Sequence, residues 1–124
     1  MEKKYLVVQV TYYRVRAHGK TRYYTKYKEL GEGYAAVMRN GKWGILTPNG
    51  NIWGRIEYSY IHMGIVENMI RVEKNGKYGY ADIETGRFIN CIFDYAYDFH
   101  DGKAKVRYKD EYRTINTAGK FIDE

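Results

Sequence analysis

The most promising group of potential metal ligands lies in the stretch FDYAYDFHDG, residues 93–102. Its three carboxylates and one imidazole belong to Asp94, Asp98, His100 and Asp101. Oxygen and nitrogen atoms of these types can bind a divalent metal. Asp side chains also end strands and cap turns, because they accept hydrogen bonds from nearby backbone N–H groups. We expect that structural role here, and neither a metal nor a cofactor.

Groups that could support catalysis are otherwise scarce. The chain has one serine, Ser59, three histidines, and no glycine-rich phosphate loop that precedes a helix. His18 and His62 have no recognisable catalytic partner in the sequence. A single cysteine, Cys91, excludes an internal disulfide and a cysteine metal cluster, and a residue of this kind is usually an inert part of the core. We therefore expect a protein that is not an enzyme.

Positive charge is concentrated in the first 28 residues. They contain eight basic side chains and one acidic side chain, a net charge of +7 in a chain whose total is +6, so the other 96 residues carry −1. Tyrosines are interleaved with these charges. We interpret residues 1–28 as one long β-hairpin that turns near His18 and Gly19. The candidate binding residues of this hairpin are Tyr12, Arg14, Arg16, His18, Lys20, Arg22, Tyr24 and Lys26.

The length of the hairpin loop decides which of these side chains share a face. A three-residue loop through residues 17–19 places four basic side chains on one face with Tyr12 and Tyr24, and sets Arg14 opposite Arg22. That like-charge pair is unfavourable unless an anion or an acidic partner lies across it. A two-residue loop separates the basic side chains between the two faces. The sequence is compatible with both loops.

Three roles are compatible with a basic, tyrosine-rich hairpin. The charges can simply keep an edge strand soluble and unpaired. Basic and aromatic side chains on one face can bind single-stranded RNA or DNA. The hairpin can also contact an acidic protein. We favour a protein partner, because nucleic-acid binding requires the basic and aromatic groups to share a face. We expect no membrane contact and no small-molecule substrate.

The sequence that follows this hairpin is repetitive. NGKWG at residues 40–44 returns as NGKYG at residues 75–79, and self-alignment gives three units with a period of 34 to 36 residues. Equivalent positions include Val37, Val72 and Val106, and also Trp43, Tyr78 and Tyr112. Each unit has two turn signals separated by about six to nine residues, which is too short for a pair of helices.

The sequence pattern of each unit predicts a small antiparallel meander. In the first unit we expect strands over residues 34–39 and 42–47 and near Ile52, with tight turns at residues 40–41 and 48–50. On the second strand the ring and the following glycine point to opposite faces, so we expect the glycine to admit a neighbouring unit and the ring to be buried. The structural residues predicted on this basis are Gly41, Trp43, Gly44, Gly76, Tyr78 and Gly79.

The third unit departs from the pattern. Asp110 replaces the turn glycine, Glu111 replaces the lysine, and Arg113 occupies the position of Gly44 and Gly79. An arginine does not fit where a neighbour packs closely, and end repeats commonly lose such residues. We expect the array to stop at this unit.

These motifs resemble those of the WG (KWG) β-repeat family, whose units combine an NGKWG or NGKYG turn, a second glycine turn and a YD-aromatic spacer. The matching stretches are NGKWG, NGKYG, TPNGN, ETGRF, TAGKF and FDYAYDFHDGKAKV. The resemblance covers about three units over residues 27–122. It implies a bacterial or phage β-repeat protein with a binding or scaffolding surface and no known catalytic residues.

The whole chain then predicts one all-β domain over residues 1–124, in which the hairpin of residues 1–28 adjoins three WG-like repeats at 29–124. Their antiparallel meanders would form a curved stacked sheet or an incomplete barrel, since three units are too few for a closed propeller. No apolar run approaches the roughly 20 residues of a membrane helix, and the start of the sequence lacks a signal-peptide cleavage site, which favours the cytoplasm. We expect a non-catalytic protein-binding module, such as a small phage or mobile-element inhibitor of a host protein.

Overall fold

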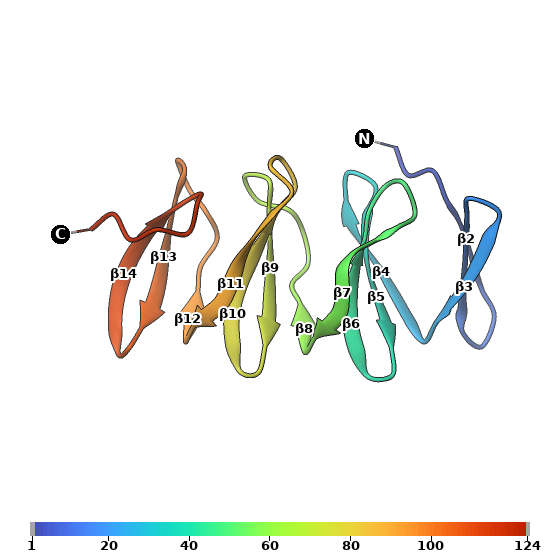
Figure 1. The fold of residues 1–124 in the computed structure, drawn as a ribbon, viewed down its shortest axis with the longest axis horizontal. Coiled ribbons are helices and arrows are strands. Elements are labelled where there is room, and N and C mark those ends of the chain that lie inside the picture. The colour runs from blue at the N-terminus through green and yellow to red at the C-terminus, as the bar shows by residue number, and fades with distance from the viewer. Residues whose placement is uncertain (1, 124) are drawn as a thin grey trace. The chain divides into compact units, whose positions relative to one another are not determined.

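The computed structural model describes residues 2–123 and contains 14 strands and no helix over them (Figure 1). The strands pair only in antiparallel fashion and form four open sheets. The predicted all-β antiparallel class is therefore confirmed. Since the described residues form no helix, none of them belongs to a helix that could cross a membrane.

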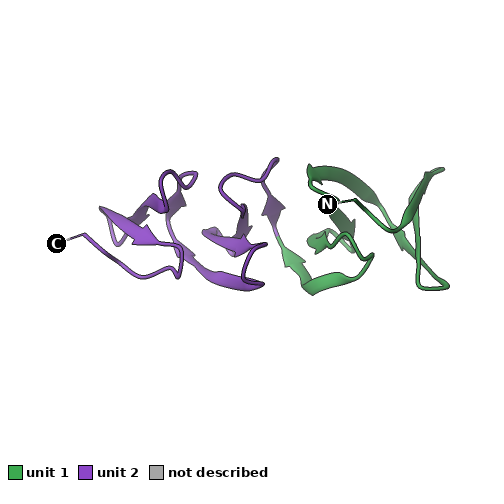
Figure 2. Ribbon diagram, turned by 90° about the horizontal axis from the view of Figure 1, so that it is seen from above, with its two compact units in different colours: residues 1–58 green, residues 59–124 purple. Residues whose placement is uncertain are grey.

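Two compact units divide the chain, one up to Tyr58 and the other from Ser59 onward (Figure 2). The first contains a three-stranded sheet of order β1-β2-β3 and a four-stranded sheet of order β4-β5-β6-β7. Their strands are β1 (Leu6–Gln9), β2 (Tyr13–Ala17), β3 (Lys20–Tyr24), β4 (Lys26–Gly31), β5 (Tyr34–Arg39), β6 (Lys42–Leu46) and β7 (Ile52–Tyr58). The basic segment of residues 1–28 is thus grouped with the first repeat.

The second unit also has two sheets, of orders β11-β10-β9-β8 and β12-β13-β14. Their strands are β8 (Tyr60–Ile61), β9 (Met69–Lys74), β10 (Lys77–Asp82), β11 (Arg87–Phe93), β12 (Tyr95–Ala96), β13 (Lys103–Tyr108) and β14 (Glu111–Asn116). Only Asp94 separates β11 from β12, so the spacer of the repeat carries the chain directly from one sheet into the next. The short strands β8 and β12 are thus the edge strands of the meanders that follow them.

The Asn-Gly pairs form the tight turns that the sequence predicts. Asn40 and Gly41 have φ values of 54° and 77°, and Asn75 and Gly76 have values of 53° and 77°. Two successive positive φ angles define a type I′ turn, whose twist matches that of the two strands it connects. The predicted strand boundaries around residues 34–47 agree with β5 and β6 to within one residue.

The repeat glycines Gly44 and Gly79 admit the third strand of their own meander. A Cβ on Gly44 would lie 2.7 Å from Cγ1 of Ile56, and one on Gly79 would lie 2.4 Å from the carbonyl oxygen of Ile89. In both sheets the register shifts at this point, because the third strand bulges across the glycine. The expectation that these glycines admit a neighbouring repeat is therefore wrong: the close approach is within one sheet.

The two repeat aromatics differ in burial. Trp43 is 8% exposed, as predicted, and the Lys28 ammonium lies 4.9 Å from its ring centroid. Tyr78 is less buried than Trp43: its side chain is partly buried and packs against the core cluster of the second unit. Its ring also joins a row of partly exposed aromatic side chains in the second unit.

Arg113 occupies the glycine position of the third repeat. Strand β14 pairs with β13 on one side, and on its other side the segment that follows it forms an antiparallel bridge between Ile115 and Phe121. The guanidinium lies 4.0 Å from the Phe121 ring centroid, and Nε donates to the Asp123 carboxylate at 3.0 Å. The residues that follow β14 therefore contact the Arg113 side chain itself.

Candidate functional site

The basic N-terminal segment is a three-stranded meander rather than one long hairpin. Strand β1 pairs with β2, and β2 pairs with β3. His18 and Gly19, with φ values of 54° and 70°, form a two-residue turn, and Ala17 lies opposite Lys20. Of the two loops that the sequence allows, this is the one that divides the basic side chains between the two faces.

The inner face of this sheet packs against the β4–β7 sheet. Tyr5, Val15 and Tyr24 form one buried cluster with Val37 and Leu46. Tyr24 is only 2% exposed, the Arg39 guanidinium carbon lies 4.9 Å from its ring centroid, and burial raises the pKa of its hydroxyl. The candidate binding residue Tyr24 is therefore part of the core and presents no ring to a ligand.

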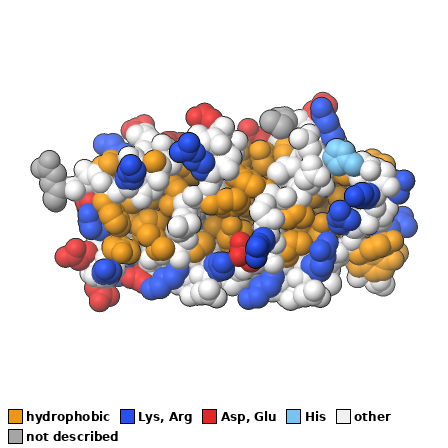
Figure 3. Space-filling model, in the orientation of Figure 1, with side chains coloured by type: hydrophobic (Ala, Val, Ile, Leu, Met, Phe, Trp, Pro, Cys, Tyr) orange, Lys and Arg blue, Asp and Glu red, His pale blue; other side chains and the backbone are white. Residues whose placement is uncertain are grey.

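The opposite face, which we call the outer face, carries two parallel rows of side chains. Register places Leu6 beside Arg16 and Arg16 beside Thr21, and it places Val8 beside Arg14 and Arg14 beside Tyr23. These side chains line a shallow hollow of about 330 Å³. Tyr12 extends the surface, because its ring meets Tyr23 edge-to-face with 5.3 Å between centroids. In Figure 3, apolar side chains lie beside Lys and Arg side chains over these N-terminal strands.

The apolar members of the outer face are unusually accessible. Leu6 is 70% exposed, Val8 is 45% exposed and Tyr23 is 52% exposed. Arg16 donates to the Thr21 hydroxyl at 2.9 Å, and neither Arg14 nor Arg16 has a carboxylate partner within the described part of the chain. The outer face therefore offers uncompensated positive charge next to uncovered apolar surface.

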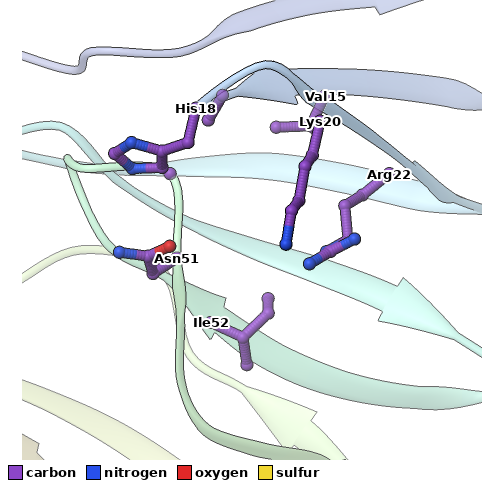
Figure 4. Close-up of a pocket in the computed structure, with 8 residues that line it drawn as sticks. Val15, His18, Lys20, Arg22, Asn51 and Ile52 are labelled. Atoms are coloured by element: carbon purple, nitrogen blue, oxygen red, sulfur yellow. The ribbon is translucent and has the colours of Figure 1, made fainter.

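The remaining basic candidates of β3 surround a separate cavity of about 230 Å³, which we call the basic cavity. Lys20 and Arg22 line one side of it, while Gly50, Asn51 and Ile52 line the other. Figure 4 shows the ends of the Lys20 and Arg22 side chains pointing into the same space, toward Ile52. Lys26, the last candidate, is exposed on β4 and lines neither surface.

His18 holds the turn of the hairpin to the loop that forms the far wall of the basic cavity. Its Nε2 lies 2.7 Å from the Asn49 carbonyl oxygen, which can only accept, so Nε2 carries the hydrogen. Gly50 has a φ of +86°, and a Cβ at this position would lie 2.4 Å from the Cβ of Ala17. The loop can approach the hairpin this closely only because residue 50 is a glycine.

The acidic stretch of residues 93–102 forms specific contacts within the second unit. Asp94 pairs with Lys77, which lowers the pKa of the aspartate, and Asp98 lies 3.2 Å from Nε of Arg71. The stretch therefore pairs with cations of the preceding repeat.

His100 and Asp101 lie near Glu67, and the three offer ligand atoms within 4.8 Å of one another, all on exposed side chains. The Glu67 carboxylate already accepts the N–H groups of Asp101 at 2.7 Å and Gly102 at 2.9 Å, and these bonds lower its pKa. The carboxylate caps a turn, and we assign no metal to this group.

A row of aromatic side chains in the second unit was not predicted from the sequence. His62 stacks on Tyr78 with 5.5 Å between centroids, Tyr78 meets Tyr95 at 4.7 Å, and Tyr95 meets Tyr97 at 4.8 Å. The Lys105 ammonium lies 5.4 Å from the Tyr97 ring centroid. The signal in the sequence is an aromatic side chain at alternate spacer positions, such as 95 and 97, because alternate residues of an extended chain share a face.

Comparison with known proteins identifies the family to which the repeats belong. A family model described as WG containing repeat matches residues 22–43, 43–78 and 88–112, which together make up about two thirds of the chain. The match begins within β3, a few residues before the predicted start at residue 27. No curated protein and no solved structure matches the chain. With three matched segments on an all-β antiparallel framework, the chain belongs to the family of WG-containing repeats.

Proposed function

We propose that the protein is a non-catalytic protein-binding module and that the outer face of its β1-β2-β3 sheet is the docking surface. The observation that carries the proposal is the alternation of exposed apolar side chains with two arginines that have no acidic partner among residues 2–123. The partner that fits this chemistry is a protein segment that combines acidic and apolar side chains.

The energetics of the outer face favour such a partner. Covering apolar surface stabilises a complex by roughly 25 cal/mol per Å² removed from water, and Leu6 and Val8 present such surface when the protein is alone. Arginine and tyrosine are enriched among the residues that dominate binding energy in protein interfaces. Arg14 and Arg16 lie on the middle strand, β2, between Leu6 and Val8 of β1 and Tyr23 of β3. An acidic side chain of the partner could pair with the two arginines while neighbouring side chains cover Leu6 and Val8.

The same observations favour a protein over single-stranded nucleic acid. The outer face has two arginines beside Tyr12 and Tyr23, but Tyr24 is in the core, and Lys20 and Arg22 lie on the opposite side of the sheet, which leaves a small platform for a strand of bases. The exposed Leu6, Val8 and Val10 have no role in binding phosphates. We include in the proposal that the protein acts in the bacterial cytoplasm, where a small inhibitor encoded by a phage or mobile element would meet a host target.

The experiment has two stages. The tagged protein is first used to capture partners from nuclease-treated bacterial lysate, and a stoichiometric partner is identified and purified. Its affinity is then measured for the wild type, for Val8→Asp and for Ile92→Asp. Val8 and Ile92 are both 45% exposed, but Ile92 lies in the second unit, so it is a matched control.

We expect Val8→Asp to weaken binding at least about tenfold and Ile92→Asp to leave it unchanged. Arg16→Glu should weaken binding similarly, while the control Arg87→Glu should not. Equal affinity for Val8→Asp and the wild type would remove the outer face from the interaction. Capture that is lost on nuclease treatment, with direct retention of short RNA or DNA instead, would replace the protein partner with nucleic acid.

A further inference from the structure

We propose that the basic cavity of the first unit is a phosphate-binding site, in which Lys20 and Arg22 hold the anion and the loop of residues 49–52 closes it. This site is distinct from the outer face, because Lys20 and Arg22 lie on the other side of β3. The inference does not depend on the identity of a protein partner.

The placement of the two cations is the first argument. Residues 20 and 22 are alternate positions of one strand, so their side chains emerge on the same face. Figure 4 shows both charged ends directed into the cavity. Neither has a carboxylate partner among the described residues. Two cations that converge without an acid repel one another. An anion between them attracts both, and these attractions offset the repulsion.

The construction of the opposite wall is the second argument. The hydrogen bond from His18 to the Asn49 carbonyl, at 2.7 Å, and the bond from the Lys4 N–H to the Pro48 carbonyl, at 2.6 Å, hold the loop at both of its sides. The backbone of Gly50 packs against Ala17 so closely that a Cβ added at this position would lie 2.4 Å from the Ala17 Cβ. Such a wall is already in place before an anion arrives, so binding requires little ordering of the loop.

The size and chemistry of the cavity indicate the class of anion. Sites for drug-sized molecules generally measure about 300–1,000 Å³, so a cavity of about 230 Å³ suits a single small group. A phosphate group carries a charge of about −1.5 to −2 at neutral pH and offers several acceptor oxygens, which suits a cavity lined by a guanidinium, an ammonium and Asn51. Val15 and Ile52 supply apolar walls, so a phosphomonoester with a short carbon substituent also fits.

The test is a titration of the full-length, isotope-labelled protein with inorganic phosphate and, separately, with glycerol phosphate, followed by NMR at constant ionic strength. We expect saturable shifts of the backbone amides of residues 18–22 and 49–52. Lys20→Ala/Arg22→Ala should weaken binding at least about tenfold, since two charge-assisted contacts are removed. The control Arg87→Ala/Lys103→Ala removes the same two charges from exposed positions of the second unit and should bind as the wild type does.

The two anions distinguish the possible sources of the phosphate group. Saturation by both supports a site that accepts a phosphomonoester, and saturation by the inorganic ion alone supports a site for free phosphate. Acetate at the same ionic strength should produce much weaker shifts. Equal binding of acetate, equal weakening by both double variants, or shifts that do not saturate would overturn the assignment. These outcomes are independent of the protein-binding test, which reads the outer face.

Discussion

Replacing Gly79 by alanine should damage the fold by steric overlap alone. Gly79 does not have a positive φ, so alanine is tolerated by the local backbone conformation. The new Cβ would nevertheless lie 2.4 Å from the Ile89 carbonyl oxygen, 2.9 Å from the Asn90 carbonyl carbon and 2.9 Å from the Cys91 nitrogen. All three obstacles are backbone atoms of the β11 bulge, so the bulge itself must move.

The cost can be assigned an approximate size. Overpacking typically costs about 1–3 kcal/mol, and we take the upper end because backbone cannot rotate away from the overlap. Alanine also restricts the unfolded chain, which offsets about 0.4–1 kcal/mol of that cost. The net loss for Gly79→Ala should therefore be about 2 kcal/mol in the free energy of unfolding.

Gly76→Ala is the matched comparison, because it lies three residues away in the same repeat. Its φ is +77°, and no atom lies within 4 Å of the added Cβ, so the substitution introduces backbone strain without overlap. That strain costs about 1–2 kcal/mol before the unfolded-state offset, which leaves about 1 kcal/mol.

The assay is urea-induced unfolding of both variants and the wild type, followed by far-UV circular dichroism, with amide hydrogen exchange in β10 and β11 as a local readout. We expect the order wild type, Gly76→Ala, Gly79→Ala, from most to least stable. If Gly79→Ala unfolds at the wild-type urea concentration, or is more stable than Gly76→Ala, then the bulge does not cross this glycine and the explanation of the repeat motif fails.

Three other substitutions test burial and electrostatics. Trp43→Ala should lower the free energy of unfolding by about 3–5 kcal/mol, since the ring is 8% exposed; an unchanged urea midpoint would contradict this. Tyr24→Ala should cost a similar amount, whereas the adjacent, 52% exposed Tyr23 should tolerate alanine within about 0.5 kcal/mol in the same assay. Glu67→Ala should destabilise the second unit at neutral pH and lose its effect in acid. The reason is that backbone N–H groups lower the pKa of the folded-state carboxyl below its ordinary value of 4.5, so its stabilising effect is present above that pH and disappears as the pH falls through the folded-state pKa. A difference between Glu67→Ala and wild type that is equal at neutral and acid pH would show that the carboxylate charge is not responsible.

The local elements of the repeats could be predicted because their signals are local. The Asn-Gly pair at residues 40–41 specifies a turn by its own backbone preference, and alternation of apolar residues such as Ile70 and Val72 identifies the buried face. Arg113 in place of the repeat glycine marked a departure of the third unit from the pattern, and there its side chain contacts Phe121 and Asp123. In each case the prediction depends only on the residue and its immediate neighbours in the sequence.

The features that sequence could not supply depend on pairing between distant residues. A glycine at position 79 indicates a close approach, but only the register of β10 with β11 shows that the approaching strand belongs to the same meander. Strand β1 was not distinguished from β2, because the turn between them contains neither glycine nor proline.

At the N-terminal turn the difference is a single residue of loop length. With a two-residue loop, Arg22 and Arg14 lie on opposite faces, and with a three-residue loop they face each other across the strands. The candidate site therefore separates into an outer face and a basic cavity, a division that composition and charge do not reveal.

The central claim, that the outer face of the N-terminal sheet docks a protein, is tested most directly by photo-crosslinking at two adjacent positions. Tyr23 is on the outer face and Arg22 is on the opposite face, so a benzoylphenylalanine at each position samples the two sides of one strand. Crosslinking is carried out in bacterial cells that express the variant protein. We predict a discrete protein adduct from position 23 and little or none from position 22. A protein adduct of equal yield from both positions, an adduct from position 22 alone, or a nucleic-acid adduct from position 23 would contradict the claim.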